Sequence, residues 1–481
     1  MPRQLVALLA CVIATSACAQ VGPLEADGDA VRHAMVGDAL LTEGAYHALS
    51  ELSDRFGPRM VGTPGHAQSL DWLERELMDL GIQTRREVFS FPGWRRGEAE
   101  VRVTEPFDRP LRAIALGYSV ATEPMDAELA LYVRGNASPE VLASYRGRVL
   151  LVPSNVRLRG GEQRQLVENA GVRGFLAVNR VGGGQLLART ANLTGEASPA
   201  PMLALTQEEG RWLQRQLEDG VTIRVQLEVT SETVTMTGEN LVATLPGTSG
   251  ETIVVGGHFD SWDLGQGAMD NGLGVVQLLE AARLLNQHSP GLTHTVEFVW
   301  FDAEEIGLWG SRAYAERHAP RDAATDIRAM LNLDMVGTPI GVNAMGFDAL
   351  LPVLTEASEA LGSWQFSQPV ANKTWIGSDH HPFIERGVPS ITFNAPIDPE
   401  AVRYYHDLGD TIDKVDRTEL ARASAIVALV TRHLALDTRV LDRLSPSETM
   451  ALFQTAGVEA SLRGIGWWPA SPMWPGARPS E

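Results

Sequence analysis

Residues 253–260 read IVVGGHFD, and this stretch decides the fold. Its first three residues are β-branched and apolar, which is typical of a strand buried in a sheet. Strands that alternate with helices predict an α/β fold with a mainly parallel sheet sandwiched by helices. The further strands that we expect are 296–301, 330–333 and 389–393, and the helices that we expect are 274–287 and about 418–435.

Polar side chains follow three of these expected strands. His258 and Asp260 come at the end of the first strand, Glu304 and Glu305 after the second, and Asp334 after the third. In an open α/β sheet, ligands gather at the carboxyl ends of the strands. We therefore expect these side chains to lie close together at one edge of the sheet.

Two further residues complete a candidate metal-binding set. Asp270 follows a glycine-rich loop, and His406 lies in the later segment YHDLGD, residues 405–410. Imidazoles and carboxylates without thiolates are ligands that zinc accepts. Each residue alone has an ordinary structural explanation, such as a helix start or packing against a neighbour. Their joint placement at strand ends and in adjoining loops favours a metal site.

The adjacent carboxylates Glu304 and Glu305 suggest a division of labour. Neighbouring side chains at a strand end point in different directions, so one can bind metal while the other faces the attacking water. A carboxylate in that second position takes a proton from the water and hands it to the leaving amine. The sequence contains no Gly-x-Ser-x-Gly nucleophile motif, which favours hydrolysis by water.

At these residues the sequence resembles the co-catalytic di-zinc exopeptidases, the family of bacterial leucyl aminopeptidases, glutamate carboxypeptidase II and carboxypeptidase Q. Residues 256–272, GGHFDSWDLGQGAMDNG, are most similar to the bacterial relatives of carboxypeptidase Q. The resemblance is strong over residues 240–440. Residues 97–236 more loosely resemble the β-rich, protease-associated insertion of several members. The resemblance implies the zinc-exopeptidase (phosphorylase/hydrolase-like) fold with such an inserted domain.

The resemblance also implies two zinc ions per chain. The residues that match the family's ligands would divide into two sets. His258, Asp270 and Asp334 would hold one zinc ion. Asp270 would bridge to the second ion, which Glu305 and His406 would complete.

Further roles follow from the resemblance alone. Glu304 would be the general base and acid, and Asp260 would orient the imidazole of His258. The loop 377–383 matches a segment near the substrate and is closer to the aminopeptidases. Asn271 stands where carboxypeptidase Q has a second Asp, so aminopeptidase and dipeptidase specificity both stay open. An exopeptidase must hold a free terminus, and residues 403–405, Arg-Tyr-Tyr, either bind a substrate carboxylate or simply pack.

Composition limits the partners of this chain. The formal net charge is −20, which argues against nucleic acid as a partner. Short peptides are the substrates that the resemblance implies. Residues 1–19 read as a signal peptide with an A-x-A cleavage site, which predicts export to the periplasm or the extracellular space. A lipoprotein anchored through Cys18 is the alternative, and no later stretch is long enough to span a membrane.

The chain is long enough for several domains. We expect a discontinuous catalytic domain at 20–96 and 237–445, an insertion at 97–236 and a Trp/Pro-rich tail at 446–481. Two other functions stay open: a mono-zinc glutaminyl cyclase, and a receptor or binding module without catalysis. A homodimer is suggested by the family resemblance alone.

Overall fold

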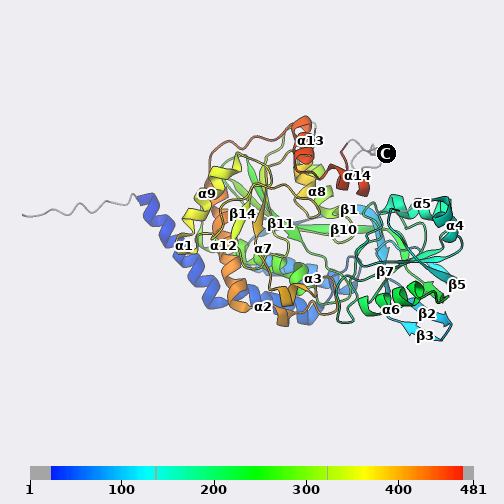
Figure 1. Ribbon diagram of the computed structural model, residues 1–481. Coiled ribbons are helices and arrows are strands. Elements are labelled where there is room, and N and C mark those ends of the chain that lie inside the picture. Colours follow the sequence, from blue (N-terminus) through cyan, green and yellow to red (C-terminus); the bar gives the residue numbers. More distant parts are fainter. Residues whose placement is uncertain (1–22, 136–137, 322, 470–481) are drawn as a thin grey trace, which may run out of the picture.

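The computed structural model describes residues 23–135, 138–321 and 323–469 of the 481-residue chain. It contains two sheets: the first lies among long helices, and the second forms the lobe at the right of Figure 1. The expected signal peptide with Cys18, and the tail beyond residue 469, lie outside the described residues. Of the helices in the described part, none combines the length and apolar character needed to cross a membrane.

Seven strands of the described residues form the first sheet, in the order β1 (Gln83–Arg95), β10 (Glu232–Leu245), β12 (Thr295–Phe301), β11 (Thr252–His258), β13 (Ile327–Asn332), β15 (Ser390–Asn394) and β14 (Gly341–Asn343). Strands β12, β11, β13 and β15 are parallel to one another, and the outer pairs are antiparallel. The predicted α/β class is confirmed. Strand β13 begins earlier than expected because it includes Arg328, whose buried charge pairs with Asp437 and interrupts the apolar pattern.

The two faces of the first sheet pack against different helices. Side chains alternate along a strand, so Ile253 and Val255 of β11 join the core formed with α7 (Leu273–His288) and α12 (Arg417–Leu436). Val254 points to the opposite face and packs with residues of α8 (Trp309–His318) and α10 (His381–Ile384). Burial on both faces explains why residues 253–255 of β11 are all apolar.

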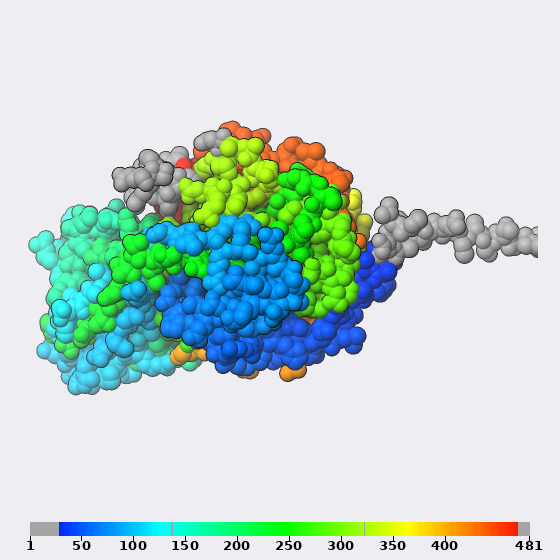
Figure 2. Space-filling model, turned by 180° about the vertical axis from the view of Figure 1, so that it is seen from behind, coloured from blue at the N-terminus to red at the C-terminus, as the bar shows by residue number. Residues whose placement is uncertain are grey.

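The N-terminal part of the described chain is helical. It forms α1 (Pro23–Thr42), α2 (Gly44–Ser50), a π-helical turn (Glu51–Phe56) and α3 (Pro64–Asp79). The chain breaks between the last two because Thr63 caps α3 with its hydroxyl and Pro64 occupies the first helical turn. Seen from behind, the blue residues of this part of the chain cover the middle of the molecule (Figure 2).

Eight strands of the described residues form the second sheet, in the order β3 (Arg109–Leu111), β2 (Ala99–Glu105), β9 (Arg224–Val229), β5 (Thr122–Leu131), β6 (Val149–Val152), β7 (Gly174–Val178), β8 (Met202–Leu205) and β4 (Ala113–Ala115). Strands β5 to β8 are parallel. The helices α4 (Pro139–Ser144), α5 (Gly160–Ala170) and α6 (Gln207–Glu218) belong to the same part of the chain. All of these elements lie between β1 and β10 in sequence.

The C-terminal part is more regular than its prolines suggest. It forms α13 (Pro446–Thr455) and α14 (Glu459–Ile465), and Ser445 caps the first with Glu448 in a reciprocal arrangement. Trp467 is buried: its ring stacks on His381, and its Nε1 donates to the carbonyl of Leu193. The described tryptophans of the tail therefore pack on their own chain. The remaining helices are α9 (Leu350–Ala360) and α11 (Pro399–Val402).

Candidate functional site

Five predicted ligands come from five separate parts of the chain. His258 is the last residue of β11, Asp334 follows β13, and Glu305 follows β12. Asp270 lies in a short helical turn, Ala268–Gly272, that leads into α7, and His406 lies in the loop after α11. Because β11, β12 and β13 are parallel neighbours, their carboxyl ends meet at one edge of the sheet.

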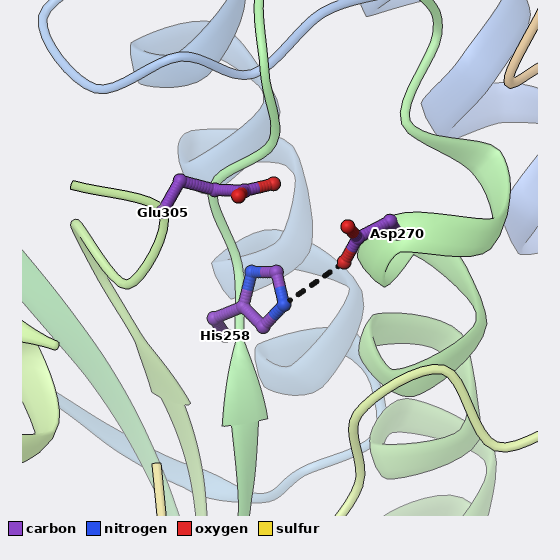
Figure 3. Close-up of side chains that lie close together, drawn as sticks. All are labelled: His258, Asp270 and Glu305. Carbon is purple, nitrogen blue, oxygen red and sulfur yellow. Dashed lines mark ion pairs between the residues drawn. The ribbon is translucent and has the colours of Figure 1, made fainter. Parts of the chain in front are cut away.

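The structure brings all five side chains together around Asp270. The Nε2 atom of His258 lies 3.2 Å from Oδ1 of Asp270 and 3.6 Å from Oδ1 of Asp334. The Nε2 atom of His406 lies 3.0 Å from Oδ2 of Asp270 and 3.1 Å from Oε2 of Glu305. Figure 3 shows His258, Asp270 and Glu305 pointing into one space. Ligand atoms of these three residues all lie within 4.8 Å of one another.

Both imidazoles are oriented by backbone carbonyl groups. Nδ1 of His258 donates to the carbonyl of Asp260, and Nδ1 of His406 donates to the carbonyl of Ala188, each at 2.9 Å. A neutral imidazole with its proton on Nδ1 turns a lone pair on Nε2 toward the neighbouring carboxylates. That arrangement is favourable when a cation lies between them, so the donor set fits a divalent metal.

The electrostatics of the cluster also favour a bound cation. Burial alone would lower the pKa of His406, but Glu305 and Asp270 outweigh it and raise the pKa to about 10. Burial raises the pKa of Glu305 to about 7, although His406 opposes this. Its atom Oε1 is buried without a hydrogen-bond partner. Carboxylates that are crowded and incompletely paired are stabilised when a metal ion supplies positive charge.

Asp260 acts on the loop that carries the two adjacent glutamates. Its Oδ1 accepts the backbone N–H of Glu304 at 3.0 Å, and its Oδ2 accepts that of Glu305 at 3.2 Å. The predicted contact with His258 is different in detail: the carboxylate lies 3.7 Å from Nδ1, and the hydrogen bond goes to the Asp260 carbonyl. The Asp260 carboxylate therefore positions Glu304 and Glu305, while its carbonyl orients the imidazole.

Glu304 lies beside the five candidate ligands and lines a cavity. Burial is the main cause that raises the pKa of its carboxyl group well above the ordinary value. His258 opposes that effect, and the carboxylates of Asp379, Glu305 and Asp334 add to it. Asp379 comes from the predicted substrate loop and is fully buried. The structure thus places this loop next to Glu304.

The cavity has a volume of about 490 Å³ and lies between the two sheets. Glu304, Glu305 and His406 line it from the first sheet, and residues from loops of the second sheet line the opposite wall. Tyr405 also lines it, and its ring stacks on His406 at a centroid distance of 3.6 Å. Arg403 does not line it: this exposed side chain pairs with Glu400 at 3.6 Å. Of the segment 403–405, Tyr405 alone contributes to the cavity wall.

Residues of two kinds were missed by the sequence analysis. Arg59 is fully buried and donates to three carbonyl groups of the loop that follows β11. Nothing in its local sequence, FGPRMVGT, indicates that contact. Arg157 and Arg180 line the cavity from loops that follow β6 and β7. The rule that ligands gather at strand ends, applied to the second sheet, could have found them.

Comparison with known proteins places this arrangement in a family. Residues 240–431 match the model of peptidase family M28. The chain is 30% identical over 459 residues to the Probable lipoprotein aminopeptidase LpqL of Mycobacterium tuberculosis, covering 85% of this chain and 87% of that protein. The chain belongs to peptidase family M28. The resemblance predicted from the sequence is therefore confirmed.

Two further comparisons place this M28 chain more broadly. It is 26% identical over 407 residues to Carboxypeptidase Q of Mus musculus, covering 80% of this chain and 84% of that protein. The crystal structure of a Peptidase M28 precursor from Shewanella amazonensis SB2B has a similar fold, with a TM-score of 0.76 at 22% identity. That likeness covers 88% of this chain and 99% of the other.

Proposed function

We propose that this chain is a zinc-dependent exopeptidase that hydrolyses short peptides and binds two zinc ions. The observation that carries this proposal is the placement of two imidazole Nε2 atoms against opposite oxygens of Asp270. Membership of peptidase family M28 supports the same reaction class. The names of the relatives include both an aminopeptidase and Carboxypeptidase Q, so these names support cleavage at either terminus.

The proposed ligands form two sets. His258, Asp270 and Asp334 would hold one ion, and Asp270, Glu305 and His406 would hold the other. A glutaminyl cyclase with one zinc would leave one imidazole facing carboxylates without a cation, so the geometry favours two ions. Zinc ions supply Lewis acidity, which polarises a carbonyl group and makes a water molecule more acidic.

Glu304 is the proposed proton carrier. Its carboxylate accepts a proton from the attacking water and then delivers it to the nitrogen of the leaving amine. Burial and neighbouring carboxylates stabilise its protonated form, which keeps the proton available for that second step. Asp260 holds Glu304 in place through the backbone N–H bond described above. A binding module without catalysis would have no need of a proton-carrying carboxylate at the cavity wall.

The second sheet and the N-terminus fit into this proposal. We propose that residues 97–236 are an inserted, protease-associated-like domain within a catalytic domain of 20–96 and 237–445. The hydrogen bond from His406 to Ala188 supports a role of the insertion in forming the site. We also propose that the protein is exported, since residues 1–19 have the features of a signal peptide and one relative is named as a lipoprotein.

The test combines zinc content and peptide hydrolysis on one preparation of the chain without residues 1–19. We expect about two zinc ions per chain for the wild type and for Glu304→Gln. We expect that variant to lose about 10²- to 10⁴-fold in kcat because only the proton carrier is removed. A wild-type rate in Glu304→Gln would refute the role of Glu304. One zinc per chain with ammonia release would favour the cyclase, and no zinc with no hydrolysis would favour the binding module.

A further inference from the structure

Three arginines enter the active-site cavity from the second sheet. Arg157 follows β6, and Arg180 and Arg189 lie in the connection between β7 and β8. Strands β6 and β7 are parallel neighbours, so their carboxyl ends open at the same edge of the second sheet. That edge faces Glu304 and Glu305 across the cavity. We refer to Arg157, Arg180 and Arg189 as the arginine cluster.

The arginine cluster lacks acidic partners. Within the described part of the chain, no carboxylate forms an ion pair or a side-chain hydrogen bond with any of the three guanidinium groups. Burial is the main cause that lowers the pKa of Arg189 to about 10, and the nearby charges of Arg157 and Arg180 add to it. Guanidinium groups carry a positive charge in proteins, so like charges gather on one wall of the cavity. Such crowding is unfavourable for folding and is relieved when an anion binds.

The cavity has the size and lining of a site for a small ligand. Its volume of about 490 Å³ lies within the range of roughly 300–1,000 Å³ found for such sites. Trp262, Leu308 and Trp467 add apolar surface to the lining of the same cavity. A peptide in this cavity would place the bond that is cut at Glu304. The residue that follows this bond would then lie among the arginines. Guanidinium groups bind carboxylates by paired, charge-assisted hydrogen bonds.

We propose that the arginine cluster binds a carboxylate of the peptide substrate, and so selects peptides that carry a negative charge close to the bond that is cut. This inference rests on the proposed peptidase function. The carboxylate is either the free C-terminus of a dipeptide or an acidic side chain on the residue after the bond. Arg403, which sequence proximity to His406 suggested for this task, is exposed and outside the cavity.

The test measures kcat and KM for three peptides on the zinc-loaded chain. Leu-Ala has a free carboxylate, Leu-Ala amide has none, and Leu-Glu amide has only a side-chain carboxylate. We expect the wild type to prefer one or both charged peptides over Leu-Ala amide by about 10- to 100-fold in kcat/KM. The double variant Arg157→Gln/Arg189→Gln should lose this preference, mainly through KM, and should retain the rate on Leu-Ala amide. Arg403→Gln is the matched control and should keep the preference.

The outcomes separate this inference from the proposed function. No cleavage of any peptide by the wild type would refute the peptidase proposal and the inference with it. Cleavage of all three at equal rates would refute the inference alone, as would an unchanged preference in the double variant. Equal losses on all three peptides would show that the arginines are structural. The single variants, checked by thermal unfolding, provide the same comparison if the double variant does not fold. The preferred charged peptide identifies the source of the carboxylate.

Discussion

Replacement of Arg59 tests how the site is held in place. Its guanidinium group is fully buried and donates to the carbonyls of Phe259 at 3.0 Å, Gln266 at 2.9 Å and Gly267 at 2.9 Å. Burial lowers its pKa to about 10, against the opposing effect of Asp410 and other acids, so the group is charged at neutral pH. One side chain thus ties together both ends of the loop between His258 and Asp270.

The magnitude follows from the three carbonyl groups. Arg59→Met keeps most of the side-chain volume but removes three hydrogen bonds from a charged donor to buried or partly buried carbonyls. Of these three carbonyls, only that of Gly267 has a second donor among the described residues, the N–H of Gly272. Each such loss costs about 1–1.5 kcal/mol, so we expect destabilisation of about 3–5 kcal/mol. Arg59→Lys retains a charge and at least one of the three bonds, so we expect an intermediate loss of about 2–3 kcal/mol.

The assay is urea unfolding of the metal-free chain, followed by zinc binding to the folded variants. Arg55→Met is the matched control, because the exposed Arg55 makes a surface ion pair with Glu51 and a cation–π contact with Phe56, and no buried carbonyl depends on it. We expect the control to lose less than about 1 kcal/mol. Arg59→Met should also bind zinc more weakly, since its loop leads to Asp270. If Arg59→Met is no less stable than Arg55→Met, the reasoning about buried carbonyl groups is wrong.

Two further perturbations give measurable results. Burial raises the pKa of Glu87, but His318 and Arg85 outweigh it and lower the pKa from 4.5 to about 2. The stability from this lowered pKa is present above about pH 4.5 and is lost as the pH falls toward 2. Glu87→Gln should therefore lower the free energy of unfolding by about 1–2 kcal/mol near neutral pH, with solvent screening allowed for. The difference between variant and wild type in urea unfolding should shrink on acidification. Removal of metal with EDTA should lower the Tm, and zinc should restore it. Zinc should raise the free energy of unfolding by about 3–4 kcal/mol when free zinc exceeds its Kd by about 100- to 1,000-fold. A Tm that does not respond to EDTA or zinc would contradict the metal centre.

Local sequence predicted the parallel strands of the first sheet, and it did not predict β1, β10 and β14. Strands β11, β12 and β15 were expected within one residue of their ends, because each is a short apolar run between polar or glycine-rich segments. The parallel order of β12, β11 and β13 then placed Glu305, His258 and Asp334 at one edge. The helices α13 and α14 were not expected, because residues 446–481 were described as a whole by their Trp and Pro content.

The sequence by itself determined which residues can bind metal and the strands that deliver them, because strand periodicity and ligand chemistry are local properties. Only the tertiary structure decided what surrounds them. Arg59 lies about 200 residues from the carbonyls it contacts, and Ala188 lies 218 residues from His406. The arginine cluster comes from a different sheet from that of Glu304. Contacts of this kind depend on how segments that are distant in sequence pack together. Such packing produces no periodic pattern of residues in either segment.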